Sequence, residues 1–590
     1  MAAALIIGVP QASAQRADPV AALARALSVP TDPTSNQEMQ ARQKELIARI
    51  DALRTVSQMR AALNLPDWRD QDADPASSKV DIAARQHLVE RLKSLLERAL
   101  RSKDVAQQLA ALTVIGEMAS TARGVGSERS LADMFTPDLV RLVESDDPIL
   151  REPAAIALSK ASGDPVIAAR ILSRLFDSPD VGPRRVAARG LENMVQQVAE
   201  LSRGSNTSTV RAGIGDVVNV GRAVLAVIGP GLRDPDVDVR RRCLNTILSA
   251  AGTFSLADVL TGAAAAEGTE PRGGPGVNVF QPLAQSLAQV TPEVTERLLD
   301  PEPSIRLLAA QVLDQIAYAR VRILRRPAGL PATPGPAGPE VSAGGAHLIL
   351  VAQMQGQRRR PPRTTPPPEL PPEAAGEGRP PDPIGRALYD SLPILERAMH
   401  DPDRRVRQTV IDTLEMLQRA ATPAIPQMAR LLYDRDKFIR WQTARTLGKL
   451  NPAKAAPEAL PGLVRLLGDN DVDVRMAASV ALERFGPEAA PAVAALARAA
   501  TRGDAEACIA AVHALEAIGS AAVAAVPSLT GLLSNDDNRV RQVAAEALGR
   551  LGPAASSALP ALQRALSDPD PDVRRAAGDA ILDIENPAEK

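Results

Sequence analysis

Asp-Pro-Asp-Pro-Asp-Val-Arg occupies residues 568–574, and close variants of this heptapeptide recur through the C-terminal part of the chain. They return roughly every 33 residues, a spacing typical of helical repeats, at 401–407, 434–440, 469–475 and 535–541. A degenerate copy, Gly-Asp-Ala-Glu-Ala-Cys-Ile at 503–509, fills the one double interval. A fixed period in this range indicates a helical solenoid, in which each repeat buries its apolar stripe against its neighbours.

Each copy of the heptapeptide predicts the start of a helix, because Asp and Asn side chains accept hydrogen bonds from the free amides of a first helical turn. Apolar residues at helical spacing follow, as in Val474, Ala478, Leu482 and Phe485. The helix is expected to stop at a glycine with a left-handed backbone, as at Gly486, Gly519 and Gly552. A shorter helix should then open around a proline, namely Pro457, Pro491, Pro527 or Pro560.

These residues resemble the HEAT-like repeats, in particular the short PBS-lyase HEAT-like subtype, with the closest copies at 538–549 and 571–580. Looser copies lie upstream at 146–151, 234–240 and 300–306, with a further copy at 177–185 that has Pro183 in the aliphatic position. The resemblance covers most of 130–326 and 383–585. It implies an all-α fold, an α-α superhelix, and it says almost nothing about activity, because a fold does not carry a function.

Composition agrees with a thin helical core. Aromatic residues make up only 2% of the chain, whereas deep globular cores normally use large rings. The formal net charge is −1, so there is no global attraction to nucleic acid or to an anionic membrane.

The chain divides into five predicted parts. They are a signal peptide at 1–14, an N-terminal helical cap at 15–126, an N-terminal repeat array at 127–326 with a loop at 262–276, a flexible Pro-rich linker at 327–383, and a C-terminal repeat array at 384–590.

Leu5–Val9 is a short apolar run, and Ala12-Ser13-Ala14 follows it with a small-x-small cleavage pattern. We therefore expect export to the periplasm or the exterior. The basic n-region is missing, and the alternative is a disordered apolar N-terminus on a cytoplasmic protein. We expect no transmembrane segment, because no apolar run reaches about 18 to 20 residues.

The insertion at 327–383 contains an apolar patch beside a basic one, and Pro and Gly surround both. The patches consist of Leu348, Ile349, Leu350 and Val351, and of Arg358, Arg359 and Arg360. Three interpretations stay open: a linker with a small strand laid on the solenoid, a partner-binding motif, and a weak nucleic-acid site that lacks nearby aromatics.

One arginine per repeat closes the heptapeptide and forms a predicted ladder of Arg407, Arg440, Arg475, Arg541 and Arg574. Each is well placed to bond the capping Asp or a carbonyl of the adjacent repeat, which would make the ladder structural. The alternative is a row of cations on the concave face that grips an acidic partner.

No catalytic motif or cofactor site is recognisable. The four histidines are scattered, and none stands in the His-Glu dipeptide that HEAT-like di-iron hydroxylases carry. Cys243 and Cys508 lie far apart in sequence and are expected to be buried packing thiols. The sequence therefore predicts a non-catalytic scaffold that binds one or more unidentified protein partners. An enzyme or enzyme subunit of the bilin-lyase-like class is the alternative.

Overall fold

The computed structural model describes residues 90–122, 134–161, 163–201, 207–255, 280–324, 379–502 and 504–585. The backbone within these ranges is helical or forms short turns, and it contains no β-strand. The all-α class and the repeat architecture are confirmed. The chain divides into two compact units, Met1–Gly273 and Gly274–Lys590. The predicted signal peptide at 1–14, residues 15–89 of the predicted cap, the loop at 262–276 and residues 327–378 of the linker predicted at 327–383 lie outside the described residues.

The first unit is a series of helices packed pairwise. Its first described helix spans residues 90–100, and the labelled helices follow it. In order they are α5 (Val105–Ala122), α6 (Thr136–Val143), α7 (Pro148–Ala161), α8 (Pro165–Arg174), α9 (Val181–Leu201), α10 (Thr207–Leu225), α11 (Gly229–Leu232) and α12 (Val237–Gly252), with 3-10 turns η2 (Leu175–Asp177) and η3 (Thr253–Ser255). Helices α5, α7, α9 and α12 pack on one another in succession.

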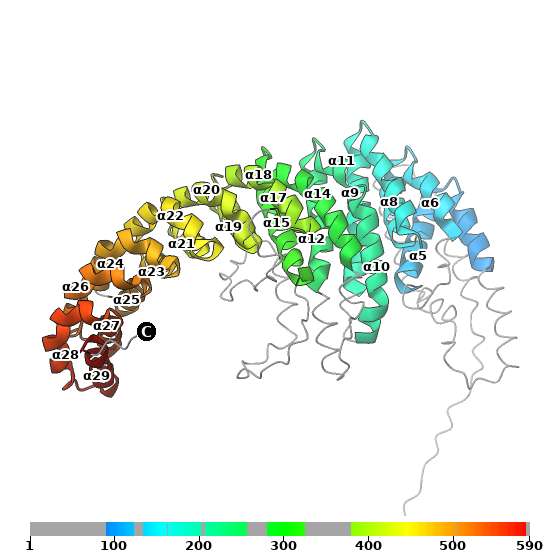
Figure 1. Cartoon of the computed structure of the whole chain (residues 1–590). Coiled ribbons are helices and arrows are strands. Elements are labelled where there is room, and N and C mark those ends of the chain that lie inside the picture. The colour runs from blue at the N-terminus through cyan, green and yellow to red at the C-terminus, as the bar shows by residue number, and fades with distance from the viewer. Residues whose placement is uncertain are drawn as a thin grey trace, which may run out of the picture. The chain divides into compact units, whose positions relative to one another are not determined.

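The second unit opens with four helices and continues as two parallel rows (Figure 1). It begins with α14 (Gln281–Glu296), η5 (Arg297–Leu299), α15 (Pro303–Leu324), α17 (Pro383–Asp390) and α18 (Leu392–Ala398). The first-row helices that follow are α20 (Ile425–Leu431), α22 (Pro452–Leu466), α24 (Val493–Ala500), α26 (Val526–Leu532) and α28 (Leu559–Ala565). The second-row helices are α19 (Arg404–Leu417), α21 (Lys437–Leu450), α23 (Val472–Phe485), α25 (Ala505–Ile518), α27 (Asn538–Arg550) and α29 (Pro571–Glu585).

The two acidic positions of the heptapeptide have separate roles. In the copy at 434–440, the carboxylate of Asp434 accepts from the amide of Asp436 at 2.8 Å and forms a tight turn. Asp436 is the N-cap of α21 and accepts from the amide of Phe438 at 2.9 Å. The aliphatic residue that follows points into the core, and the five equivalents are each 0% exposed: Val406, Ile439, Val474, Val540 and Val573.

The second-row helices end on a backbone that favours glycine. The φ angles of Gly486, Gly519 and Gly552 are +57°, +74° and +60°. Each glycine begins a seven-residue 3-10 segment, and a short first-row helix follows each segment, as the sequence predicts. The segments are η6 (Gln418–Ala424), η7 (Gly486–Ala492), η8 (Gly519–Ala525) and η9 (Gly552–Ala558). In η6 the same position holds Gln418, whose φ is +53°, so this repeat carries backbone strain that the others avoid.

Helix α22 departs from the expected pattern because it begins at Pro452 rather than near Pro457. No glycine ends α21. Instead Asn451 takes an extended conformation, and its side chain accepts from the amide of Lys454 at 3.4 Å. This cap starts the helix one turn early, and Pro457 and Pro461 lie inside it.

The array is continuous across the insertion. Helix α15, which precedes the gap, packs on α17 and α19, which follow it. Arg320, which is 1% exposed, pairs with Asp382, and its Nε lies 2.9 Å from a carboxylate oxygen. The hydroxyls of Thr295 and Ser391 lie 3.1 Å apart. The chain therefore leaves and re-enters the array between neighbouring helices.

One stretch of the described chain, Ala505–Leu532, has the length and composition of a membrane span. It is an exception to the expectation that no apolar run is long enough. The structure divides it into α25, η8 and α26, with a turn at Gly519. Half of its most apolar window is buried, and α25 packs against α23 and α27.

Candidate functional site: the arginine ladder and the second-row surface

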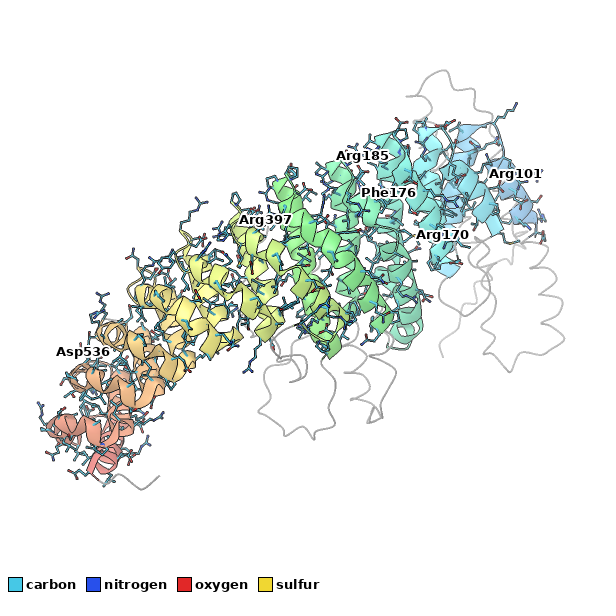
Figure 2. The ribbon with its side chains drawn as sticks, turned by 45° about the horizontal axis from the view of Figure 1, so that its top comes forward. Arg101, Arg170, Phe176, Arg185, Arg397 and Asp536 are labelled. Atoms are coloured by element: carbon cyan, nitrogen blue, oxygen red, sulfur yellow. The ribbon has the colours of Figure 1, made fainter. Side chains whose placement is uncertain are left out.

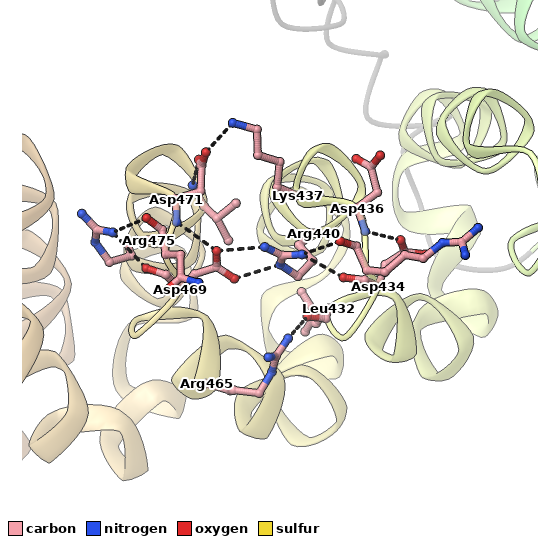
Figure 3. Close-up of polar contacts among 12 residues, drawn as sticks. Leu432, Asp434, Asp436, Lys437, Arg440, Arg465, Asp469, Asp471 and Arg475 are labelled. Atoms are coloured by element: carbon pink, nitrogen blue, oxygen red, sulfur yellow. Dashed lines mark hydrogen bonds and ion pairs between the residues drawn. The ribbon is translucent and has the colours of Figure 1, made fainter.

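Arg440 joins two repeats through both ends of its guanidinium (Figure 3). Its Nη1 donates to the carbonyls of Asp434 and Arg435, at 2.9 and 3.2 Å, within its own repeat. Its Nε and Nη2 donate to the two carboxylate oxygens of Asp469 in the next repeat, at 2.8 and 2.9 Å. The two side chains are 15% and 6% exposed. This bidentate, part-buried pair is the strong form of an arginine–carboxylate contact.

The other predicted ladder residues repeat this geometry as far as their neighbours permit. Arg407 donates to the carbonyl of Asp401 at 2.8 Å and to Asp434 at 3.1 Å. Arg541 donates to the carbonyl of Asn535 at 2.8 Å and to both carboxylate oxygens of Asp568, at 2.8 and 2.9 Å.

The last two ladder residues differ from the rest. Arg475 donates to the carbonyl of Asp469 at 2.9 Å and pairs with Asp504, the N-cap of α25. Arg574 donates to the carbonyls of Asp568 and Pro569, at 2.7 and 2.9 Å. It is exposed, and no carboxylate partner for it occurs among the described residues.

Upstream copies of the heptapeptide supply further ladder residues that the sequence analysis did not assign. In the first unit, Arg184 donates to Asp234 at 2.8 Å and to the carbonyl of Ser178 at 2.9 Å. In the second unit, Arg306 donates to Asp401 at 2.6 Å and to the carbonyl of Asp300 at 3.0 Å. The Arg306 contact bridges the insertion. The signal was available, because Arg184 follows the aliphatic position of the copy at 177–185 and Arg306 closes the copy at 300–306.

Counted from its N-cap, Asp504, the degenerate copy begins one residue earlier than the sequence indicated, so Cys508 rather than Ile509 stands at the position of the ladder arginine. The amide of Cys508 bonds the carbonyl of Asp504, just as the amide of Arg475 bonds the carbonyl of Asp471. The Cys508 side chain is 1% exposed, and burial, with Asp504 nearby, raises the pKa of its thiol. Burial likewise raises the pKa of the Cys243 thiol. Both cysteines are free buried thiols without the thiolate character that reactivity requires.

A buried carboxylate ties α19 to α21 away from the ladder. Glu415 is 4% exposed and accepts from Arg445 at 2.8 Å, Thr446 at 3.0 Å and Lys449 at 2.7 Å. Because the acceptor lies on α19 and the three donors lie on α21, this cluster is a further contact between neighbouring repeats.

The outward surface of the second row is formed by the residues two, five and nine positions after each capping Asp, which share one face of each helix. Side chains at these positions are exposed or half-buried throughout the row. The central position changes from repeat to repeat: Gln408, Trp441, Met476, Ile509, Gln542 and Arg575. The first unit also carries ion pairs on its surface. Arg185, labelled in Figure 2, donates from its Nη2 to a carboxylate oxygen of Asp236 at 2.7 Å.

Helix α21 carries one exposed and one half-buried aromatic ring on this surface. Phe438 is 51% exposed, whereas the other five phenylalanines of the chain are at most 8% exposed. Arg404 and Lys437 lie over its ring, at 5.6 and 5.3 Å from the centroid. Trp441 is half-buried one turn later, and the guanidinium of Arg445 lies 5.1 Å from its ring centroid. We call Arg404, Lys437, Phe438, Trp441 and Arg445 the α21 patch.

The pockets found in the described part of the chain are open depressions rather than enclosed cavities. Two open depressions of about 400 and 330 Å³ share His400, Asp401 and Pro402 at the edge of the ladder. No group of three His, Cys, Asp or Glu side chains suited to a metal ion occurs among the described residues. The predicted partner motif, Leu348–Val351 with Arg358–Arg360, lies outside them and stays a prediction.

Comparison with known proteins identifies the repeats. The family of HEAT repeats matches at residues 391–483, 425–516, 465–549 and 494–582. No curated protein matches the chain significantly.

Among solved structures, an engineered protein is 18% identical, with a TM-score of 0.38, and the match covers 83% of this chain and 98% of that one. A designed armadillo repeat protein in complex with the peptide (KR)4 is 19% identical, with a TM-score of 0.29, over 33% of this chain and 99% of that one. The more specific PBS-lyase subtype stays a prediction. Residues 391–582 are therefore identified as HEAT repeats.

Proposed function

We propose that the chain is a scaffold that binds other proteins through the outward surface of its second-row helices. The observation that carries this proposal is a difference between two sets of side chains on the same helices, the ladder arginines and the outward-facing residues. The ladder arginines are tied to carbonyls and carboxylates of the array itself, whereas the central outward position, one residue further along, is half-buried or exposed and changes between neighbouring repeats. Exposed aromatic and arginine side chains are the residue types that carry most protein-binding energy.

The location of this scaffold is proposed from the N-terminal sequence. Leu5–Val9 and Ala12–Ala14 support export and cleavage near Gln15. N-terminal sequencing of the protein purified from its own cells tests this directly. A mature chain that begins near residue 15 supports export, and an intact Met1 contradicts it.

Photo-cross-linking in the native cell tests the binding surface. A photoreactive amino acid is placed at Met476 or Gln542 on the second row and, as matched controls, at Ala494 or Gln563 on exposed first-row positions. We expect discrete protein adducts from the second-row positions and none from the first-row positions. Equal adducts from both rows, or adducts from the first row alone, would contradict the proposal.

A further inference from the structure

Charge is unevenly distributed along the C-terminal array. Residues 401–467 contain twelve Lys and Arg against seven Asp and Glu, whereas residues 468–536 contain four against nine. A nearly neutral chain therefore presents a basic segment, which includes α19 to α22, followed directly by an acidic one. Such a separation steers charged partners toward one part of a surface.

The basic excess is on the surface rather than in the ladder. Arg407 and Arg440 are 6% and 15% exposed in their ion pairs. In contrast, Arg404, Arg405 and Lys437 are 48%, 64% and 51% exposed. Their carboxylate partners, Asp436, Asp403 and Asp471, are also N-caps that already accept backbone amides. Exposed pairs of this kind contribute little to stability and exchange readily for a better partner.

The same segment holds the exposed aromatic rings. Phe438 and Trp441 stand three residues apart on α21, so they share one helix face. The next outward positions along the row, Met476 and Ile509, are half-buried and apolar. Rings flanked by cations, with an apolar strip beside them, offer an anchor for an apolar side chain and charged partners for the residues around it.

We propose that the α21 patch binds an acidic protein segment that carries an aromatic or large aliphatic residue. The apolar residue packs on Phe438 and Trp441, and its neighbouring carboxylates pair with Arg404 and Lys437. A protein segment fits better than nucleic acid, because Asp403, Asp436 and Asp471 alternate with the cations, and separated positive charges suit a few spaced carboxylates better than a continuous phosphate backbone. This inference rests on the proposed function and specifies the chemistry of one binding site within it.

Fluorescence tests the proposal in the full-length chain. The sequence has two tryptophans, so a Trp68→Phe chain leaves Trp441 as the only tryptophan reporter. The probes are a short peptide in which Asp and Glu flank one Leu, a matched peptide with Lys and Arg in place of the acids, and oligo(U). We expect the acidic peptide alone to shift the emission of Trp441, and added salt to weaken the effect.

Variants locate the site independently of the reporter. With a fluorescein-labelled acidic peptide, we expect affinity to fall about tenfold or more in Phe438→Ala and in Arg404→Gln/Lys437→Gln, the range for central interface residues. The matched control is Leu582→Ala, which truncates an exposed apolar residue in α29 and should leave affinity unchanged. Circular dichroism verifies that each variant keeps its fold.

Three outcomes would overturn the proposal. They are equal binding of the acidic and basic peptides, tighter binding of oligo(U), and acidic-peptide binding that Phe438→Ala leaves unchanged. If no peptide binds while second-row photo-cross-linking still yields protein adducts, the acidic-segment proposal fails and the scaffold function stands. If those adducts are absent as well, both fail.

Discussion

The N-terminal ends and the outward faces of the second-row helices follow different rules. At the ends, the same side chain makes the same contacts in several repeats, as Arg407, Arg440 and Arg541 do. On the outward faces, the equivalent positions change from Trp441 to Met476 to Ile509 within three repeats. Residues that recur with the period hold the stack together. Residues that break the period are therefore the ones that can distinguish one binding partner from another.

Acid should have the largest effect on the helix ends, because it acts on more than one ladder carboxylate at once, as Asp469 and Asp568 show. Burial raises the pKa of Asp469, but its hydrogen bonds to Arg440 and to the amide of Asp471 together lower it further, below the ordinary value. The hydrogen bond from Arg541 likewise lowers the pKa of Asp568. A carboxylate with a lowered folded-state pKa contributes stability above its unfolded pKa, near 4, and loses it as pH falls through the folded pKa.

We therefore expect the melting temperature to change little from pH 7 to about 5 and to drop steeply below about pH 4. Circular dichroism melts across this range measure the effect. Asp469→Asn is the control, since it should lower stability at neutral pH and reduce the acid dependence. A melting temperature that rises on acidification would contradict a stabilising ladder.

Among single substitutions of the ladder arginines, Arg440→Ala should produce the largest effect. It leaves the 6%-exposed carboxylate of Asp469 and two carbonyls without their guanidinium donor. We expect a loss of about 3 kcal/mol in the free energy of unfolding, measured by urea titration of the full-length chain. The matched control is Arg435→Ala, an exposed arginine in the same turn. Equal losses in the two variants would show that the ladder contact is not special.

The strained position at the end of α19 allows a change in the opposite direction. Gln418 has φ +53° and ψ −133°, nearly the angles of Gly486 at the end of α23, which are +57° and −130°. Gln418→Gly should stabilise the array by about 1 kcal/mol, and Gly486→Ala should destabilise it by about the same amount. Thermal melts of the two single variants measure both signs. A loss of stability in Gln418→Gly would mean that the contacts of the glutamine side chain outweigh its backbone strain.

Local sequence signals predicted most of the C-terminal array, because each helix start and stop depends on residues within a single turn of the chain. The Asp caps and the positive φ of Gly486 both depend only on nearby residues. The start of α22 was missed although its signal is local: Asn451 is the N-cap and Pro452 is the first helical residue. The carboxylate partner of Arg440 lies in the next repeat, and only the stacking of the two repeats brings it into reach.

The α21 patch was not predicted for a related reason. Phe438 and Trp441 fit the apolar spacing of a core helix, and sequence alone does not show which apolar residue of a helix faces outward. The exposure of Phe438 follows from the burial of its neighbour Ile439, which occupies the core position of the phrase. Once the register of the heptapeptide is known, every outward position in the array can be assigned in the same way.

The smallest expected effect distinguishes the two halves of the ladder contact. Arg574 keeps the bonds to the carbonyls of Asp568 and Pro569 but is exposed and meets no carboxylate of a following repeat among the described residues. Arg574→Ala should therefore change the free energy of unfolding by no more than about 0.5 kcal/mol, as exposed contacts usually do. Urea titration beside Arg440→Ala makes the comparison direct. If the two variants lose equal stability, the carbonyl bonds within one repeat carry the energy. A large difference assigns it instead to the carboxylate of the next repeat, which is the contact that couples neighbouring repeats into one stack.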